Sequence, residues 1–209
     1  MIGPLVFGVI VTMLTFLEYD FMIGLGWDPV HSSDVPWPSA LGPYGYFQVA
    51  NFVFFGGCLI SFGLGLRRGV RASGRSSRVG PALVIVAGIA MLLLGFKADP
   101  RTSGLPQSWH GWIHALAFVV VALAILAAFF VLWPRLKRDP LWSGYGSYTL
   151  ISGVLYVLLL LMSFTDLIIP GQVAFYLFLA VMLAWIEVTA IRLRSITMGT
   201  PSGRVMSTG

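Results

Sequence analysis

Two histidines stand four residues apart in the sequence, at His110 and His114. If a helix begins before His110, both imidazoles lie on one face of it, where two histidines can bind one metal ion. The glutamate of a zinc-protease motif is lacking, so a third ligand has to come from elsewhere; the candidates are Asp99, Glu18, Asp20, Asp166 and His31. The pattern predicts a zinc site formed by His110, His114 and Asp99. The alternative is that the histidines make hydrogen bonds or contact lipid head groups.

The composition decides which kind of protein positions these side chains. Of the 209 residues, 57% are apolar and only 10% are charged, and the mean hydropathy is +0.88. Because a soluble domain has about a quarter of its residues charged, a soluble enzyme and a nucleic-acid-binding module are excluded. Cys58 is the only cysteine, which excludes a disulfide-stabilised chain. The sequence therefore predicts an all-α integral membrane protein.

Six apolar segments are long enough to cross a bilayer, which needs roughly 20 residues in a helix. The sequence predicts a single domain, residues 1–209, with six transmembrane helices at about 2–23, 44–66, 80–98, 113–133, 148–169 and 173–194. Pro134 is expected to follow the fourth span, and Pro170 with Gly171 to form a tight hairpin. Small residues indicate where helices approach closely, at Gly57, Ser61 and Gly65 in the second span and Ala87, Gly88 and Gly95 in the third.

Polar side chains concentrate at one end of five of these six segments. Glu18 and Asn51 would lie about 7 to 10 Å inside the boundary of the membrane. Ionisable groups are costly at such depth, so they normally face a partner or a water-filled cavity. We expect an outward-facing pocket that binds a small polar ligand or a lipid head group, formed by Glu18, Asp20, Asn51, Asp99, His110, His114 and Asp166. The alternative is a ring of carboxylates at the head-group level, with Lys97 paired to one of them.

Basic residues predict the orientation, since cytoplasmic loops carry an excess of Lys and Arg. Eleven of the 13 basic residues fall on one side, and only Lys97 and Arg101 fall on the other. This distribution predicts a cell-membrane protein with both termini in the cytoplasm. The arginines of one loop also suit anionic lipid head groups, although topology alone would explain them: Arg67, Arg68, Arg71, Arg75 and Arg78.

Two short motifs carry a family resemblance. The first is the stretch 39–46, SALGPYGY, which leads into a Phe- and Gly-rich span. The second joins Gly95-Phe96 and Asp99 to His110-Gly111 and His114, with Lys97 inside the stretch, where it could neutralise Asp99. With these motifs the chain resembles the prokaryotic six-span membrane proteins catalogued as domain of unknown function 998, over nearly the whole transmembrane region. The resemblance implies six helices and an Asp and His arrangement at one face, and it supplies no established reaction.

Three functions are compatible with these residues. The leading expectation is a binding or transport-like protein whose outward pocket holds a small polar ligand or lipid head group. The second is an accessory or structural subunit of a larger membrane complex. The third is a metal-dependent lipid hydrolase, loosely similar to the alkaline ceramidases, in which zinc lowers the pKa of a water to about 7 and a carboxylate acts as base. The sequence requires no cofactor, and it favours binding over catalysis.

Overall fold

The computed structural model describes residues 2–27, 37–70, 78–100, 105–165 and 167–198. Over these ranges all regular secondary structure is helical, without a strand. The helices are α1 (Gly3–Leu17), α2 (Tyr19–Gly24), η1 (Trp37–Ala40), α3 (Gly45–Gly69), α4 (Val79–Leu93), α5 (Trp109–Arg138), η3 (Pro140–Trp142), α6 (Tyr145–Met162) and α7 (Gly171–Met198).

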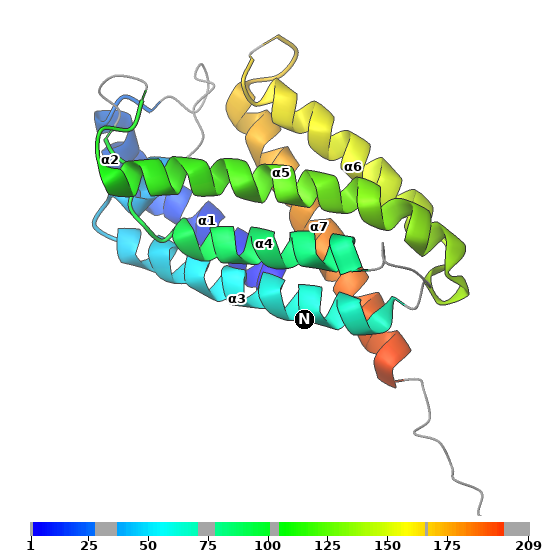
Figure 1. Ribbon diagram of the computed structural model, residues 1–209. Helices are drawn as coiled ribbons and strands as arrows, with labels where there is room; N and C mark the ends of the chain where they lie inside the picture. Colours follow the sequence, from blue (N-terminus) through cyan, green and yellow to red (C-terminus); the bar gives the residue numbers. More distant parts are fainter. Residues whose placement is uncertain (1, 28–36, 71–77, 101–104, 166, 199–209) are drawn as a thin grey trace, which may run out of the picture.

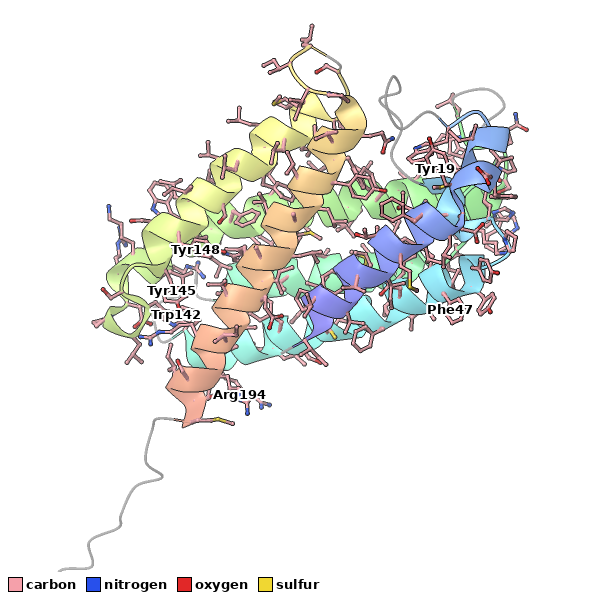
Figure 2. The ribbon with its side chains drawn as sticks, turned by 180° about the vertical axis from the view of Figure 1, so that it is seen from behind. Tyr19, Phe47, Trp142, Tyr145, Tyr148 and Arg194 are labelled. Atoms are coloured by element: carbon pink, nitrogen blue, oxygen red, sulfur yellow. The ribbon has the colours of Figure 1, made fainter. Side chains whose placement is uncertain are left out.

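The long helices form one bundle (Figure 1). Each packs on the next along the chain from α3 to α7, and α1 closes the arrangement by packing on α3 and α7. We call the end where α1 and α4 finish and α3 and α5 begin the histidine end, and the opposite end the arginine end. Figure 2 places Trp142, Tyr145 and Tyr148 at the arginine end, and Tyr19 and Phe47 at the histidine end. Aromatic side chains at both ends are typical of a membrane protein.

Helix length and composition support the membrane class. Within the described residues, four helices are long and apolar enough to cross a membrane, namely α3, α5, α6 and α7. The helices α1 and α4 are apolar but shorter, with 15 residues each. The fold is therefore all-α, and its long helices have the length and composition of membrane-spanning helices.

Several helix boundaries differ from the ends of the predicted spans, and each difference has a local cause. The first predicted span, 2–23, is broken at Glu18, which ends α1 and precedes α2. The predicted span 80–98 ends as α4 at Leu93, whereas α5 begins earlier than expected because Ser108 caps it. Pro134 lies inside α5, not after it; a helix in a membrane tolerates proline when its surroundings satisfy the freed carbonyl. Residues 163–170 separate α6 from α7, so this connection is longer than a tight hairpin.

Glycine allows α3 and α4 to approach closely, at positions that match the predicted ones only in part. A Cβ atom on Gly56 would lie 2.8 Å from the backbone oxygen of Gly88, and a Cβ on Gly88 would lie 2.9 Å from that of Gly56. Of the small residues predicted to lie at helix contacts in α3, Gly65 does so, because a Cβ atom there would lie 2.8 Å from Leu193 of α7. A Cβ atom on Gly57, in contrast, would have nothing within 4 Å. The contact of α3 with α4 is thus made by Gly56, the neighbour of Gly57, which belongs to the regular four-residue pattern.

Candidate functional site

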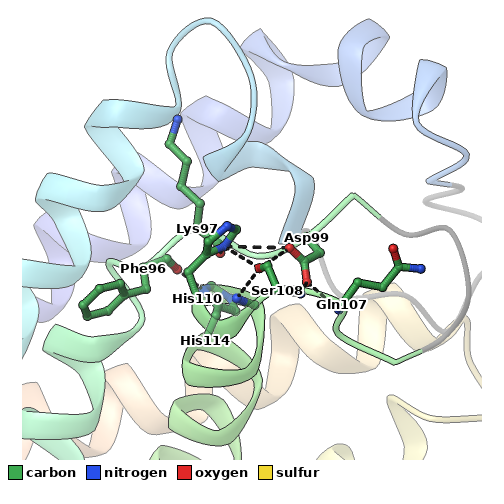
Figure 3. A network of polar contacts seen from close by, with 8 residues as sticks. Phe96, Lys97, Asp99, Gln107, Ser108, His110 and His114 are labelled. Atoms are coloured by element: carbon green, nitrogen blue, oxygen red, sulfur yellow. Dashed lines mark hydrogen bonds and ion pairs between the residues drawn. The ribbon is translucent and has the colours of Figure 1, made fainter.

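Asp99 lies over the N-terminus of α5 (Figure 3). Its Oδ2 accepts hydrogen bonds from the backbone N–H groups of Gln107 at 2.7 Å and Ser108 at 2.8 Å, and its Oδ1 accepts one from the Ser108 hydroxyl at 2.5 Å. The first N–H groups of a helix have no partner within the helix, and the helix dipole favours a negative charge there. The hydrogen bonds from Ser108 hold the pKa of the Asp99 carboxyl below its usual range. Asp99 is therefore an ionised cap of α5.

The two histidines, which lie in the first turns of α5, contact the chain that follows α4. His110 Nδ1 lies 2.9 Å from the carbonyl oxygen of Lys97, and His114 Nδ1 lies 2.8 Å from that of Phe96 and 3.1 Å from that of Leu94. A carbonyl oxygen only accepts, so each Nδ1 carries a hydrogen and donates it. These three carbonyls lie directly after α4, which ends at Leu93. The histidines therefore fasten the start of α5 to the end of α4 (Figure 3), and we call Asp99, Ser108, His110 and His114 the clasp.

Ser108, His110 and Asp99 are the residue types of a nucleophilic triad, but their arrangement differs from one. In a triad the histidine accepts the proton of the serine hydroxyl. Here Ser108 Oγ donates to Asp99, accepts from the backbone N–H of Gly111 at 3.0 Å and lies 2.8 Å from His110 Nδ1, which already donates to Lys97. The Ser108 hydroxyl therefore serves as a helix cap in this arrangement.

The predicted zinc site is only partly assembled. Over the ranges that the structure covers, no three His, Cys, Asp or Glu side chains are grouped so that they could hold a metal ion. His110 Nδ1 lies 3.8 Å from Asp99 Oδ1, and His114 turns its Nδ1 to carbonyl oxygens. Asp166 and His31 fall outside the described residues. The side chains of the clasp are thus arranged for hydrogen bonds to the backbone.

Glu18 has a role at α3 that parallels that of Asp99 at α5. Its side chain is 1% exposed, and its Oε1 accepts a hydrogen bond at 2.6 Å from the backbone N–H of Tyr44, the residue that precedes α3. Gly42 makes room for the carboxylate, because a Cβ atom there would overlap Glu18 Oε2. The buried carboxylate therefore anchors the chain where it enters α3.

Asn51 and Asp20 make no hydrogen bond to the clasp among the described residues. Asn51 is buried, and its Nδ2 donates to the carbonyl oxygen of Phe7 at 3.1 Å, whereas its Oδ1 has no hydrogen-bond partner among the described residues. Asp20 is exposed on α2. Of the seven predicted pocket residues, the structure brings Asp99, His110 and His114 together.

A cavity of about 100 Å³ lies inside the bundle next to the clasp. It is bounded by α1, η1, α3, α4, α5 and α7, and its walls are mostly apolar. Three polar residues line it, namely Ser39, Gln48 and His114. Gln48 is 4% exposed, and its Oε1 has no hydrogen-bond partner within the part of the chain that the structure covers. Such a volume holds about three water molecules or a small organic group.

Sequence reasoning left Gln48 out of the predicted site. The signal for it was an amide inside an apolar segment, one helical turn before Phe52, which lines the same cavity. The ring of Phe52 meets the imidazole of His114 edge to face, with 6.1 Å between the ring centres. The cavity thus places one predicted residue, His114, beside one that was missed.

Asp99→Asn is expected to remove a pH-dependent part of the stability. The pKa of folded Asp99 is lowered, so the ionised carboxylate stabilises the fold fully above the unfolded pKa of about 4, and this contribution is lost as pH falls through the lowered folded value. Thermal unfolding of both proteins in detergent should show a gap in Tm that is constant from about pH 7 to about pH 5 and narrows in stronger acid. Asp20→Asn is the matched control and should show little gap. A gap for Asp99→Asn that persists unchanged in acid would contradict the assignment.

The comparisons with known proteins agree with the motifs of this junction. The family model described as "Protein of unknown function (DUF998)" matches residues 4–194. No curated protein and no solved structure matches the chain. The matched range includes the stretch 39–46 and all four residues of the clasp. Because the match covers far more than half of the chain, the chain belongs to the DUF998 family.

Proposed function

We propose that this protein is a multi-pass membrane protein that binds a small, partly polar ligand in the cavity beside His114. The observation that carries the proposal is the buried Oε1 of Gln48, which lacks a hydrogen-bond partner among the described residues. Leaving such an acceptor unsatisfied costs about 1–3 kcal/mol, and most buried polar groups in folded proteins are hydrogen-bonded. A ligand that donates a hydrogen bond to Gln48 would remove this cost.

The walls of the cavity indicate what else the ligand contains. Phe7, Phe52, Phe118 and Phe175 contribute aromatic surface, which favours an apolar part next to the polar one. The clasp supports binding indirectly, because its hydrogen bonds to carbonyl oxygens fix the orientation and tautomer of the His114 ring. The arrangement thus suits an amphiphilic molecule, such as a lipid with a small head group.

Gln48→Leu is expected to stabilise the protein without ligand by about 1 kcal/mol, because it replaces an unsatisfied buried acceptor by an apolar group of similar size. Binding residues commonly cost stability in this way. Chemical unfolding of the detergent-solubilised variant and wild type, after exhaustive delipidation, measures the difference. A clear loss of stability would contradict the proposal, because it would show that the Gln48 amide is already satisfied within the folded chain.

We also propose that the chain crosses the membrane six times, with both termini in the cytoplasm. The shorter apolar helices α1 and α4 supply the two spans that are needed in addition to α3, α5, α6 and α7. Each is about 22 Å long at about 1.5 Å per residue, and the turns that follow them extend this length. Arg67 and Arg68 in the last turn of α3, and Lys137 and Arg138 in that of α5, lie at the arginine end. Cations there favour a cytoplasmic position and attract anionic lipid head groups.

Cysteine labelling tests this topology. Cys58→Ala removes the only thiol, and Ser33→Cys, Ser76→Cys and Ser103→Cys then place single thiols in three connections between helices. A membrane-impermeant maleimide applied to intact cells is expected to label positions 33 and 103 and to leave position 76 unlabelled until the cells are lysed. Labelling of position 76 alone in intact cells would invert the proposed orientation.

A second candidate function, an accessory subunit of a larger membrane complex, is supported by an apolar groove of about 790 Å³ between α1 and α7. Small residues line part of it, as they do where membrane helices associate, namely Gly8, Thr12, Ala180 and Ala184. A subunit with a purely structural role needs no ligand site, however. The unsatisfied acceptor of Gln48 therefore favours ligand binding as the first candidate.

A further inference from the structure

We infer that the ligand of the cavity beside His114 is a neutral molecule with a hydroxyl group, such as an aliphatic alcohol, and not a phosphate, a carboxylate or an amine. This inference rests on the proposed function, since it names the class of ligand for the same cavity. It follows from three properties of the cavity: the kind of polar groups that line it, the charges on its walls and its volume.

Two hydrogen-bond acceptors on the cavity walls require a donor from the ligand. Gln48 Oε1 is buried without a hydrogen-bond partner among the residues described. The Nδ1–H of His114 is committed to the carbonyl oxygens of Phe96 and Leu94, so the second ring nitrogen, Nε2, is an acceptor when the imidazole is neutral. A hydroxyl group can donate to either acceptor. An ether, a ketone or an ester carbonyl could accept from the amide N–H groups of Gln48, but it has no hydrogen to donate to these two acceptors.

The walls of the cavity exclude a charged ligand. None of the side chains that line it belongs to Asp, Glu, Lys or Arg. Burying an ionised group without a partner of opposite charge is far more costly than burying a neutral polar group. Carboxylates, phosphates and ammonium groups would therefore have to give up their hydration without compensation, whereas a hydroxyl exchanges one hydrogen bond to water for one to Gln48 or His114.

The volume limits how much of the ligand the cavity holds. At about 100 Å³ it is smaller than the engineered cavity of about 150 Å³ that takes benzene. It therefore has room for the hydroxyl and the first few carbons of a chain. The rings of Phe7, Phe118 and Phe175 lie along the walls that those carbons would contact.

Two isomeric probes separate the hydroxyl from the rest of the molecule. 4-Fluorobutan-1-ol and 1-fluoro-3-methoxypropane have the same formula and differ in that only the alcohol has a hydrogen to donate. Binding to the full, detergent-solubilised chain is measured by fluorine NMR, with protein-free micelles as the reference for partitioning. We expect the alcohol to bind about tenfold more tightly than the ether, because the ether leaves the buried acceptor unsatisfied. 4-Fluorobutanoate, which is ionised at neutral pH, should not bind.

Two variants identify the acceptor. Gln48→Leu is expected to lower the affinity for the alcohol to that for the ether. Gln172→Leu is the matched control, because Gln172 is also a buried amide without a hydrogen-bond partner among the described residues, but it does not line the cavity. This control should keep the preference for the alcohol.

The outcomes separate the inference from the proposed function. Equal binding of alcohol and ether to the wild type, or tighter binding of the carboxylate, would overturn the inference and leave a binding cavity in place. A preference that survives Gln48→Leu, or that Gln172→Leu abolishes as well, would overturn the assignment of Gln48 as the acceptor. If no probe binds above the micelle reference, both the inference and the proposed function fail.

Discussion

Gly111→Ala should destabilise the protein by about 2 kcal/mol, although alanine is intrinsically the better helix former by about 1 kcal/mol. Gly111 lies in the first turn of α5, directly beneath the carboxylate of Asp99. A Cβ atom there would overlap Asp99 Oδ2 and lie 2.6 Å from Asp99 Cγ. The carboxylate would have to leave its hydrogen bonds to Gln107 and Ser108. Denaturant unfolding in detergent measures the loss.

Two further variants show whether the effect passes through Asp99. Gly57→Ala is the matched control, because it places a methyl group on α3 where nothing lies within 4 Å; it should leave stability unchanged or raise it slightly. In a double-mutant cycle, Gly111→Ala should cost much less in an Asp99→Ala background, since the carboxylate that it displaces is gone. Additive effects of the two substitutions would contradict the proposed contact.

The meeting of Asp99 with His110 and His114 could be predicted from the sequence, but the role of these residues could not. The four-residue spacing correctly put both histidines on one face of a helix that begins at Trp109. Residue types suggested that they would bind a metal with Asp99. In the structure their partners are backbone groups that lie just after α4 and just before α5. Every residue carries the same backbone groups, so a pattern of side chains does not reveal which of them need a partner.

Tertiary packing explains the other differences. Polarity alone placed Glu18 in an outward-facing pocket, whereas the chain folds the stretch 42–44 over its carboxylate. Gln48 was missed because an amide near the end of an apolar segment usually finds a partner in a neighbouring helix or in water. Whether it does so depends on which helices surround it, and this is decided by close approaches such as that of Gly56 and Gly88. Helix composition, in contrast, sufficed to predict the all-α membrane fold.

Glu18 and Asp99 together explain why carboxylates gather at the histidine end. Three of the long helices that the structure describes, α3, α5 and α7, begin there, and the N-terminus of a helix is the positive end of its dipole. Glu18 binds the backbone N–H that precedes α3, and Asp99 binds those that precede α5. Each carboxylate comes from the chain just after an earlier helix, α1 or α4, so each also joins two helices. Both sequence motifs that carry the resemblance contain the glycine that makes room for the carboxylate.

This parallel leads us to expect that Gly42→Ala destabilises the protein as much as Gly111→Ala does, by about 2 kcal/mol. A Cβ atom on Gly42 would overlap Glu18 Oε2 and lie 2.6 Å from Oε1. Because the Glu18 side chain is 1% exposed, the carboxylate has little free space to move into and would be forced away from the N–H of Tyr44. Denaturant unfolding again measures the loss.

The control for this substitution is Gly24→Ala at the end of α2, where a Cβ would have nothing within 4 Å. Gly24→Ala should change stability by no more than a few tenths of a kcal/mol, as is usual for surface positions. The cost of Gly42→Ala should fall in a Glu18→Ala background, since the smaller side chain leaves space for the new methyl group. If the cost were the same with and without the carboxylate, Gly42 would be required for the backbone of its own turn, and Glu18 would not be the reason for the glycine in this motif.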